Sequence, residues 1–222
     1  MKLVLPYVNQ VFSCDEENVW TVVIENQNCL YKILTDIESQ MSGNEGKTIL
    51  SENEKVVRVD KRMELLTQII PFDMNQKAIL NKIMAEMQKN ALQDEYYIRA
   101  NELLANWTAF CMDLTWDLPG DIEFKKINIE SLVKAAGIEI ENEYECLGEK
   151  LIDYFELVEA YECKKLFVLL NVRSFMIDTE MENFLKEVIA RDYQVLLLEN
   201  KEYPILKGER RYIIDAGLCE IC

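Results

Sequence analysis

Apolar residues follow two different periods along this chain. Towards both ends, short apolar runs such as 19–24, 166–170 and 194–198 have the length and the Val, Ile and Leu content of buried strands. Between them, apolar positions recur every three or four residues over long stretches, as on the buried face of an amphipathic helix. The pattern therefore predicts an α/β fold whose sheet is interrupted in sequence by helices.

Strands with one helix between them are predicted for the first third. Residues 19–24 form the first clear strand, and Leu30, Ile33 and Ile37 mark a helix over 29–42. Shorter strands are predicted near 48–50, 56–59 and 63–70. The prolyl residue at position 71 then ends the strand pattern.

The middle of the chain is predicted to be helical. Two helices, from about 75 and over 95–114, are expected to form an antiparallel hairpin because a short link joins them. A short helix over 129–136 and a small strand over 138–141 follow. A third long helix over 142–163 has near-heptad apolar spacing, so part of it is expected to pack against a partner chain.

A βαβ unit is predicted for the last third. Residues 166–170 and 194–198 are its strands, and Asp178 is expected to cap the helix between them. Strands near 211–215 and 218–221 complete the sheet. The predicted organisation is an α/β head over 1–74 and 164–222, with a helical leg over 75–163.

Composition excludes several classes of protein. Among 222 residues there is no histidine, which removes Ser-His-Asp and Cys-His catalysis and all histidine-ligated metal centres. The apolar runs are too short to span a membrane, and the apolar stretch near the N-terminus is too short for the core of a signal peptide. A cytoplasmic protein with reduced cysteines, without a membrane partner, is therefore expected. The net charge of −16 by itself disfavours nucleic acid as a partner.

Two motifs resemble nucleotide or ligand sites. Gly43-Asn-Glu-Gly46-Lys47-Thr48 has two residues between its glycines where a phosphate loop needs four, and it follows a helix instead of a strand. It is interpreted as a turn. Asn171 and Glu199 follow or end predicted parallel strands, where open α/β sheets bind ligands, but they are interpreted as turn formers.

Charged residues supply the candidate binding sites. Asp117, Asp121 and Glu123 surround a Pro-Gly turn and are candidate calcium ligands, with a solvated acidic turn as the alternative. The basic candidates for contact with DNA are Lys125, Lys126, Lys134, Lys207, Arg210 and Arg211. One chain offers no convincing basic patch, but a symmetric ring would repeat a small patch around its axis.

Several stretches of this chain resemble one protein family. They include Lys164-Lys-Leu-Phe-Val-Leu-Leu-Asn171, Gln194-Val-Leu-Leu-Leu-Glu199, Ile70-Pro-Phe-Asp73 and Leu132-Val-Lys-Ala-Ala-Gly137. Their order and spacing are similar to the accessory spacer-acquisition proteins of type II-A CRISPR systems, the Csn-two family. The resemblance covers nearly the whole chain.

The resemblance implies a P-loop-ATPase-like head without a nucleotide site, and a helical leg. It implies a calcium-stabilised homotetrameric ring that binds ends of double-stranded DNA and acts in antiviral defence. Integrase proteins and an RNA-guided effector nuclease are the implied partners. By position, Asp121 and Glu123 fall in the family's calcium-bearing turn and Lys134 in its Lys-x-x-Gly. Where relatives carry further acids, this chain has Lys125 and Lys126.

Three functions are weighed on these grounds. The first is a non-enzymatic homotetramer that binds DNA ends without sequence preference. The second is a protein-binding scaffold of the adaptation complex without direct DNA binding, which the net charge favours. The third is a nucleotide hydrolase, for which the sequence supplies no complete phosphate loop.

Overall fold

The computed structural model describes residues 1–14 and 18–221 and divides the chain into two compact units. Unit 1 consists of Met1–Asp73 and Asn142–Cys222, and unit 2 is Met74–Glu141. Both sheets belong to unit 1, and unit 2 is helical. The structure therefore confirms an α/β fold whose sheet part is interrupted in sequence by a helical insertion.

A mainly parallel sheet forms the centre of unit 1. Its strands lie in the order β10-β9-β3-β8-β7-β6, and only β10 runs antiparallel to its neighbour. The strands are β3 (Val19–Ile24), β6 (Met63–Leu66), β7 (Leu166–Leu170), β8 (Gln194–Glu199), β9 (Glu209–Ile214) and β10 (Glu220–Ile221). β7 is wholly apolar and β3 is apolar except for Thr21, as expected for strands whose two faces are both covered by helices.

A second, antiparallel sheet in the order β2-β1-β4-β5 completes the strand content of unit 1. Its strands are β1 (Lys2–Val4), β2 (Val11–Ser13), β4 (Ile49–Glu52) and β5 (Lys55–Val57). Leu3, Phe12 and Leu50 are fully buried in one core with Trp20 of β3. The small sheet thus shares its core with the central sheet.

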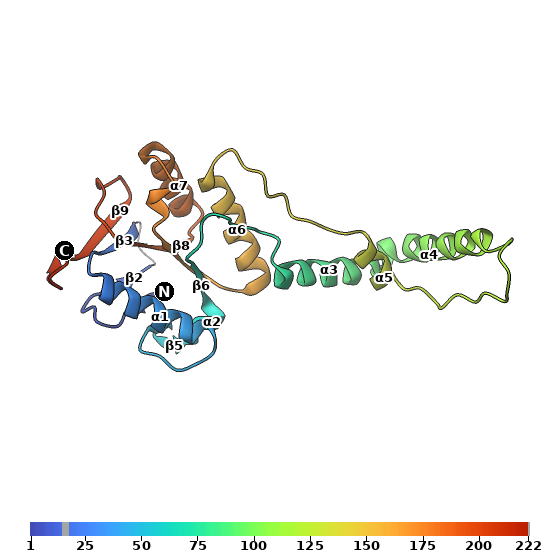
Figure 1. Ribbon diagram of the computed structural model, residues 1–222, viewed down its shortest axis with the longest axis horizontal. Coiled ribbons are helices and arrows are strands. Elements are labelled where there is room, and N and C mark those ends of the chain that lie inside the picture. The colour runs from blue at the N-terminus through green and yellow to red at the C-terminus, as the bar shows by residue number, and fades with distance from the viewer. Residues whose placement is uncertain (15–17, 222) are drawn as a thin grey trace. The chain divides into compact units, whose positions relative to one another are not determined.

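Helices pack on both faces of the central sheet (Figure 1). The helical segments of unit 1 are α1 (Gln27–Met41), α2 (Val59–Arg62), α6 (Leu147–Glu162), the 3-10 turn η1 (Val172–Ser174) and α7 (Asp178–Ala190). Ile33 of α1 packs with Val22 and Trp20, whose side chains point to one face. Phe155 of α6 stacks on Phe167 of β7 on the other face, with ring centroids 4.0 Å apart.

Helix α6 corrects the predicted boundary of the leg. It was expected to belong to 75–163 and to pack in part on a partner chain, but it lies in unit 1. Leu151, Phe155 and Val158 are buried. Full burial of such a side chain contributes roughly 1.5–3 kcal/mol, which favours packing on the sheet over exposure. The near-heptad spacing therefore marks a face that packs within the chain.

Unit 2 contains α3 (Lys77–Ala91), α4 (Asp94–Leu114) and α5 (Ile129–Ala135). Figure 1 shows α4 continuing roughly in the direction of α3, so the predicted antiparallel hairpin is wrong. A hairpin would bury a stripe of α4, and α4 has no buried residue. The predicted strand over 138–141 is also absent: the Ile140 backbone exchanges two hydrogen bonds with the Asn75 side chain, at 2.7 and 3.1 Å.

Candidate functional site

The basic candidates of unit 2 differ in how freely their charge is presented. Lys125 and Lys126 are exposed in the extended segment between α4 and α5, and neither forms an ion pair with any residue that the structure describes. Lys134, in the last turn of α5, donates to Glu130 at 2.6 Å, and its ammonium is therefore partly neutralised. Lys125 and Lys126 are thus the stronger pair for contact with a phosphate.

The basic candidates of unit 1 are not equivalent either. Lys207 is exposed, and Arg210 is exposed with its guanidinium 4.4 Å from the centre of the Trp20 ring. The Arg211 side chain is only 12% exposed and forms ion pairs with Glu202 at 3.0 Å and Glu209 at 3.5 Å. Since a phosphate contact needs an accessible cation, Arg211 does not suit the role that the sequence suggested for it.

Arg211 instead borders a buried ionic network on one face of the central sheet. Arg173 of η1 is 4% exposed and donates to Glu209 at 3.0 Å and to Asp178 at 3.0 Å. Thr21 of β3 donates to the same Glu209 oxygen at 3.0 Å. The sequence predicted that Asp178 caps α7. In the structure Asp178 is instead the first residue of α7, and its carboxylate pairs with Arg173. The network joins two parallel strands, β3 and β9, to η1 and α7.

Glu199 lies at the end of β8 beside this network and is fully buried. One carboxylate oxygen accepts from the Arg173 backbone N–H at 3.1 Å, and the other has no partner among the described residues. Burial raises the pKa of Glu199 to about 7, the Arg173 N–H and charge lower it, and the Glu209 charge raises it further. Glu199 was interpreted from the sequence as a turn former. The structure shows instead a buried acid at the carboxyl edge of the sheet, with a pKa near neutrality.

A further basic spot comes from residues far apart in sequence. Lys32 of α1 and Lys47 place their ammonium groups 5.6 and 5.5 Å from the centre of the Tyr7 ring. Tyr7 is 56% exposed. Sequence reasoning missed this cluster because its three members come from three segments with no shared motif.

The Gly43–Thr48 motif is a turn, as interpreted. It lies between α1 and β4, and the backbone N–H groups of Lys47 and Thr48 donate to Asp36 at 2.7 and 2.8 Å. Those amides are therefore occupied by a carboxylate of the chain itself. A phosphate loop would have to join a parallel strand to the helix that follows it. Only Glu25 and Asn26 separate β3 from α1, and Asn26 caps the helix by accepting from Cys29 N–H.

The candidate calcium ligands do not converge within one chain. Asp117, Asp121 and Glu123 are all exposed, in the segment after α4. Among the described residues, no three His, Cys, Asp or Glu side chains lie close enough together to hold a metal ion. Calcium needs about six to eight oxygen ligands, so these three side chains do not make a calcium site by themselves.

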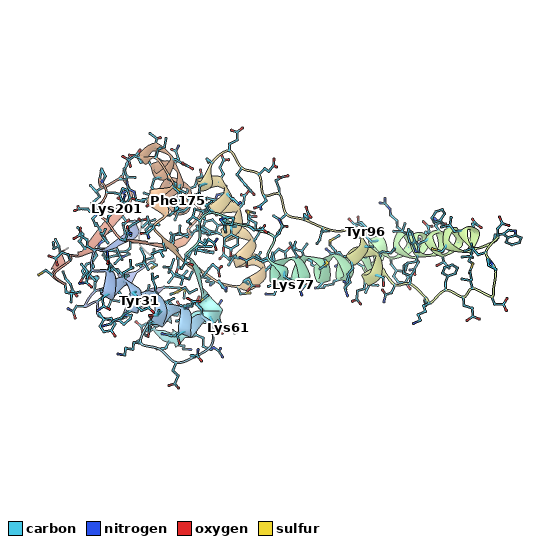
Figure 2. The ribbon with its side chains drawn as sticks, viewed as in Figure 1. Tyr31, Lys61, Lys77, Tyr96, Phe175 and Lys201 are labelled. Atoms are coloured by element: carbon cyan, nitrogen blue, oxygen red, sulfur yellow. The ribbon has the colours of Figure 1, made fainter. Side chains whose placement is uncertain are left out.

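Unit 2 exposes an unusual amount of apolar surface. Figure 2 shows the side chains along α4, with Tyr96 labelled near its start. Large side chains of α4 and the following turn are between 45% and 87% exposed: Tyr96, Tyr97, Ile98, Leu103, Trp107, Phe110, Met112, Leu114, Trp116 and Leu118. A hollow of about 390 Å³ lies against α4 and is lined in part by Met87, Leu103 and Ile129. Exposed apolar area of this extent is typical of an interaction surface.

Comparison with known proteins gives consistent matches. The family model described as CRISPR-associated protein (Cas_Csn2) matches residues 40–218. A CRISPR-associated protein Csn2 from Enterococcus faecalis is 23% identical over 155 residues, covering 68% of each chain. Another from Streptococcus agalactiae is 22% identical over 200 residues, covering 89% of this chain and 88% of the relative.

Solved structures resemble this chain more weakly. The dimeric, post-hydrolysis ATP-binding cassette MJ0796 bound to ADP and Pi has a TM-score of 0.42 at 10% identity, over 96% of this chain and 88% of that chain. The ATP-binding cassette MJ1267 of an ABC transporter has a TM-score of 0.42 at 12% identity, over 99% of this chain and 89% of that chain. A likeness at this level carries no argument about function.

Across the described residues, no helix has the length and apolarity needed to cross a membrane.

Proposed function

Because this chain belongs to the Csn2 family of CRISPR-associated proteins, we propose that it is a non-enzymatic, sequence-independent double-stranded DNA-binding protein. It acts in spacer acquisition, in the cytoplasm, as a homotetrameric ring that binds DNA ends. Integrase proteins and the RNA-guided effector nuclease of the same system are its partners. The proposal extends the family's defence role to a molecular activity.

The observation that carries DNA binding is the pair of adjacent lysines in unit 2. Lys125 and Lys126 are exposed and form no ion pair with described residues, so binding a phosphate breaks no existing contact. The chain's net charge of −16 opposes DNA, and attraction therefore has to be local. Phosphate contacts read no bases, which accounts for indifference to sequence.

Association of copies is supported by α4. Its aromatic and aliphatic side chains are exposed in a single chain, and burial of such area favours association at roughly 25 cal/mol per Å² before the costs of binding. A closed cyclic assembly repeats each lysine pair around its axis. Four copies thus concentrate positive charge that one copy presents only twice.

Calcium, in this proposal, bridges carboxylates from more than one copy. Asp117, Asp121 and Glu123 are exposed and supply oxygen ligands, but one chain does not gather three of them. A cation there would offset repulsion between acidic subunits. Calcium binding should therefore accompany assembly, and a single subunit should bind it weakly.

The test of DNA binding is the salt dependence of affinity for a linear duplex. Lys125→Ala/Lys126→Ala is compared with Lys55→Ala/Lys186→Ala, which removes two exposed lysines from unit 1 and changes net charge equally. Each lost phosphate contact lowers the slope of log K against log salt by about 0.9, so the first variant should lose about 1.8 for each copy whose lysine pair contacts the duplex, and the second almost nothing. Fluorescence anisotropy at several salt concentrations measures both slopes.

Equal slopes for the two variants would refute the assignment of these lysines. A closed circle that competes as well as a linear duplex would refute end binding. Absence of duplex binding, with and without calcium, would favour the second candidate, a protein-binding scaffold. The excess of acidic surface charge is the observation that favours that alternative.

A further inference from the structure

A groove lies between α6 and α7 on the surface of unit 1. Its volume is about 660 Å³. Gly148, Ile152 and Phe184 form an apolar floor, and Ile177 is 72% exposed at its rim. Gly148 of α6 lies beside Phe184 of α7: a Cβ at Gly148 would lie 3.4 Å from Phe184 Cβ, an ordinary van der Waals contact.

The walls of the groove are acidic. Glu149, Asp153, Glu180 and Glu187 line it, and Arg191 is its one basic lining residue. Arg191 is already paired, with Glu187 at 3.2 Å and with Glu156 on α6 at 3.9 Å. The carboxylates thus outnumber the lining cation by four to one, and that cation is already neutralised.

The groove also presents polar groups that are available to a ligand. Glu180 is engaged at the start of α6, where it accepts from Leu147 N–H at 2.9 Å and Gly148 N–H at 3.3 Å. Asp153 accepts from the Tyr144 hydroxyl at 2.9 Å. By contrast, the Glu149 carboxylate and the Asn183 amide have no hydrogen-bond or ion-pair partner among the described residues. Both can meet an incoming donor without breaking a contact.

We propose that this groove binds a short, basic, amphipathic segment of a partner protein. An apolar side chain of that segment lies over Ile152, Phe184 and Ile177, and Lys or Arg side chains pair with Glu149 and Asp153. Charge complementarity identifies the occupant, because a phosphate backbone or an acidic segment would be repelled by the same walls. The inference goes beyond DNA binding and does not rest on it.

The size of the groove agrees with a short segment. Pockets for small ligands are about 300–1,000 Å³, and this volume accommodates a few side chains and not a folded domain. The recognition mode is that of an amphipathic segment whose anchors enter an apolar groove between helices. Exposed carboxylates at the rim add orientation and rate of association more than affinity.

The experiment titrates the full-length protein with a fluorescent synthetic peptide in which Leu and Lys recur at helical spacing. A peptide of the same length with Glu in place of Lys, and one with Ser in place of Leu, separate the charge requirement from the apolar requirement. Two variants remove groove features, Glu149→Lys and Ile177→Ser. The matched control is Glu159→Lys, which reverses an exposed charge on α6 outside the groove lining.

The Leu–Lys peptide should bind and the other two should not. Glu149→Lys should weaken binding about fivefold to tenfold, since attraction by one exposed carboxylate becomes repulsion. Ile177→Ser should weaken it roughly fivefold through lost apolar contact. Glu159→Lys should change it by less than about twofold.

Three results would overturn the inference. Absence of binding is one, and equal weakening by Glu149→Lys and Glu159→Lys, which would indicate general attraction to an acidic surface, is another. The third is a change in the mass of the assembly when the peptide is added, because that would show a second copy of this chain to be the occupant. Circular dichroism of each variant checks that the fold is retained.

Discussion

The buried carboxyl of Glu199 makes the stability of unit 1 depend on pH in a direction opposite to that of most acids. Its folded pKa of about 7 lies above the ordinary value of 4.5 because the side chain is fully buried. Between these two values the folded protein holds the proton and the unfolded chain has released it. Rising pH therefore favours unfolding over this range.

The magnitude follows from the two pKa values. The full difference corresponds to about 3 kcal/mol, since one pKa unit is worth roughly 1.4 kcal/mol. About 2 kcal/mol of it falls between pH 5.5 and 8.5, a range above the isoelectric point of about 4.5 where the protein stays charged. Glu199→Gln removes the titration and keeps the shape of the side chain. The new amide has no acceptor in place of the unpartnered oxygen, which adds a cost independent of pH.

The assay is urea denaturation of the wild type and of Glu199→Gln at a series of pH values. The free energy of unfolding of the variant, minus that of the wild type, should rise by about 2 kcal/mol from pH 5.5 to 8.5. Glu38→Gln is the control, an exchange at an exposed position of α1. The difference in free energy of unfolding between Glu38→Gln and the wild type should stay constant over the same pH range. If the difference between Glu199→Gln and the wild type also stays constant with pH, Glu199 does not have a raised pKa in the folded protein, and the reasoning from its burial and its unpartnered oxygen is refuted.

Two other variants test the network and the apolar surface. Arg173→Met removes the shorter ion pair of the buried Glu209 and leaves it only the longer one, to Arg211 at 3.5 Å. The variant should lower the free energy of unfolding by about 3 kcal/mol, while Arg173→Met/Glu209→Gln should recover part of the loss in the same urea assay. Trp107→Ser/Phe110→Ser removes exposed apolar area from α4 and should shift the mass found by light scattering towards a single subunit, with and without calcium; an unchanged mass would exclude α4 from the interface.

The strands of the central sheet were predictable because they are buried on both faces. β7 is wholly apolar, β3 is apolar except for Thr21, and β8 is apolar between Gln194 and Glu199, a pattern that few other environments produce. The short edge elements were not: β1 and β2 have three residues each, too few to show a period. For α6, spacing revealed an apolar face but not its partner, and that face packs on Phe167 and Phe184 of the same chain.

The candidate site was predictable only where neighbours in sequence make it. Lys125 and Lys126 are adjacent, so their joint exposure needed no fold to predict. The meeting of Arg173, Glu199 and Glu209 depends on the register of parallel strands, which no local pattern gives. One signal existed for Arg211: it is two residues after Glu209 on the same strand, and both side chains therefore face the network.

The sparse interior of unit 2 has a consequence for its thermal stability. Within 74–141, which the structure describes throughout, Met74, Ile79 and Val133 are the buried apolar side chains. So small an interior offsets little of the conformational entropy lost by ordering three helices. Melting of these helices should therefore shift to higher temperature as protein concentration rises, because subunits that meet supply burial that no single chain provides.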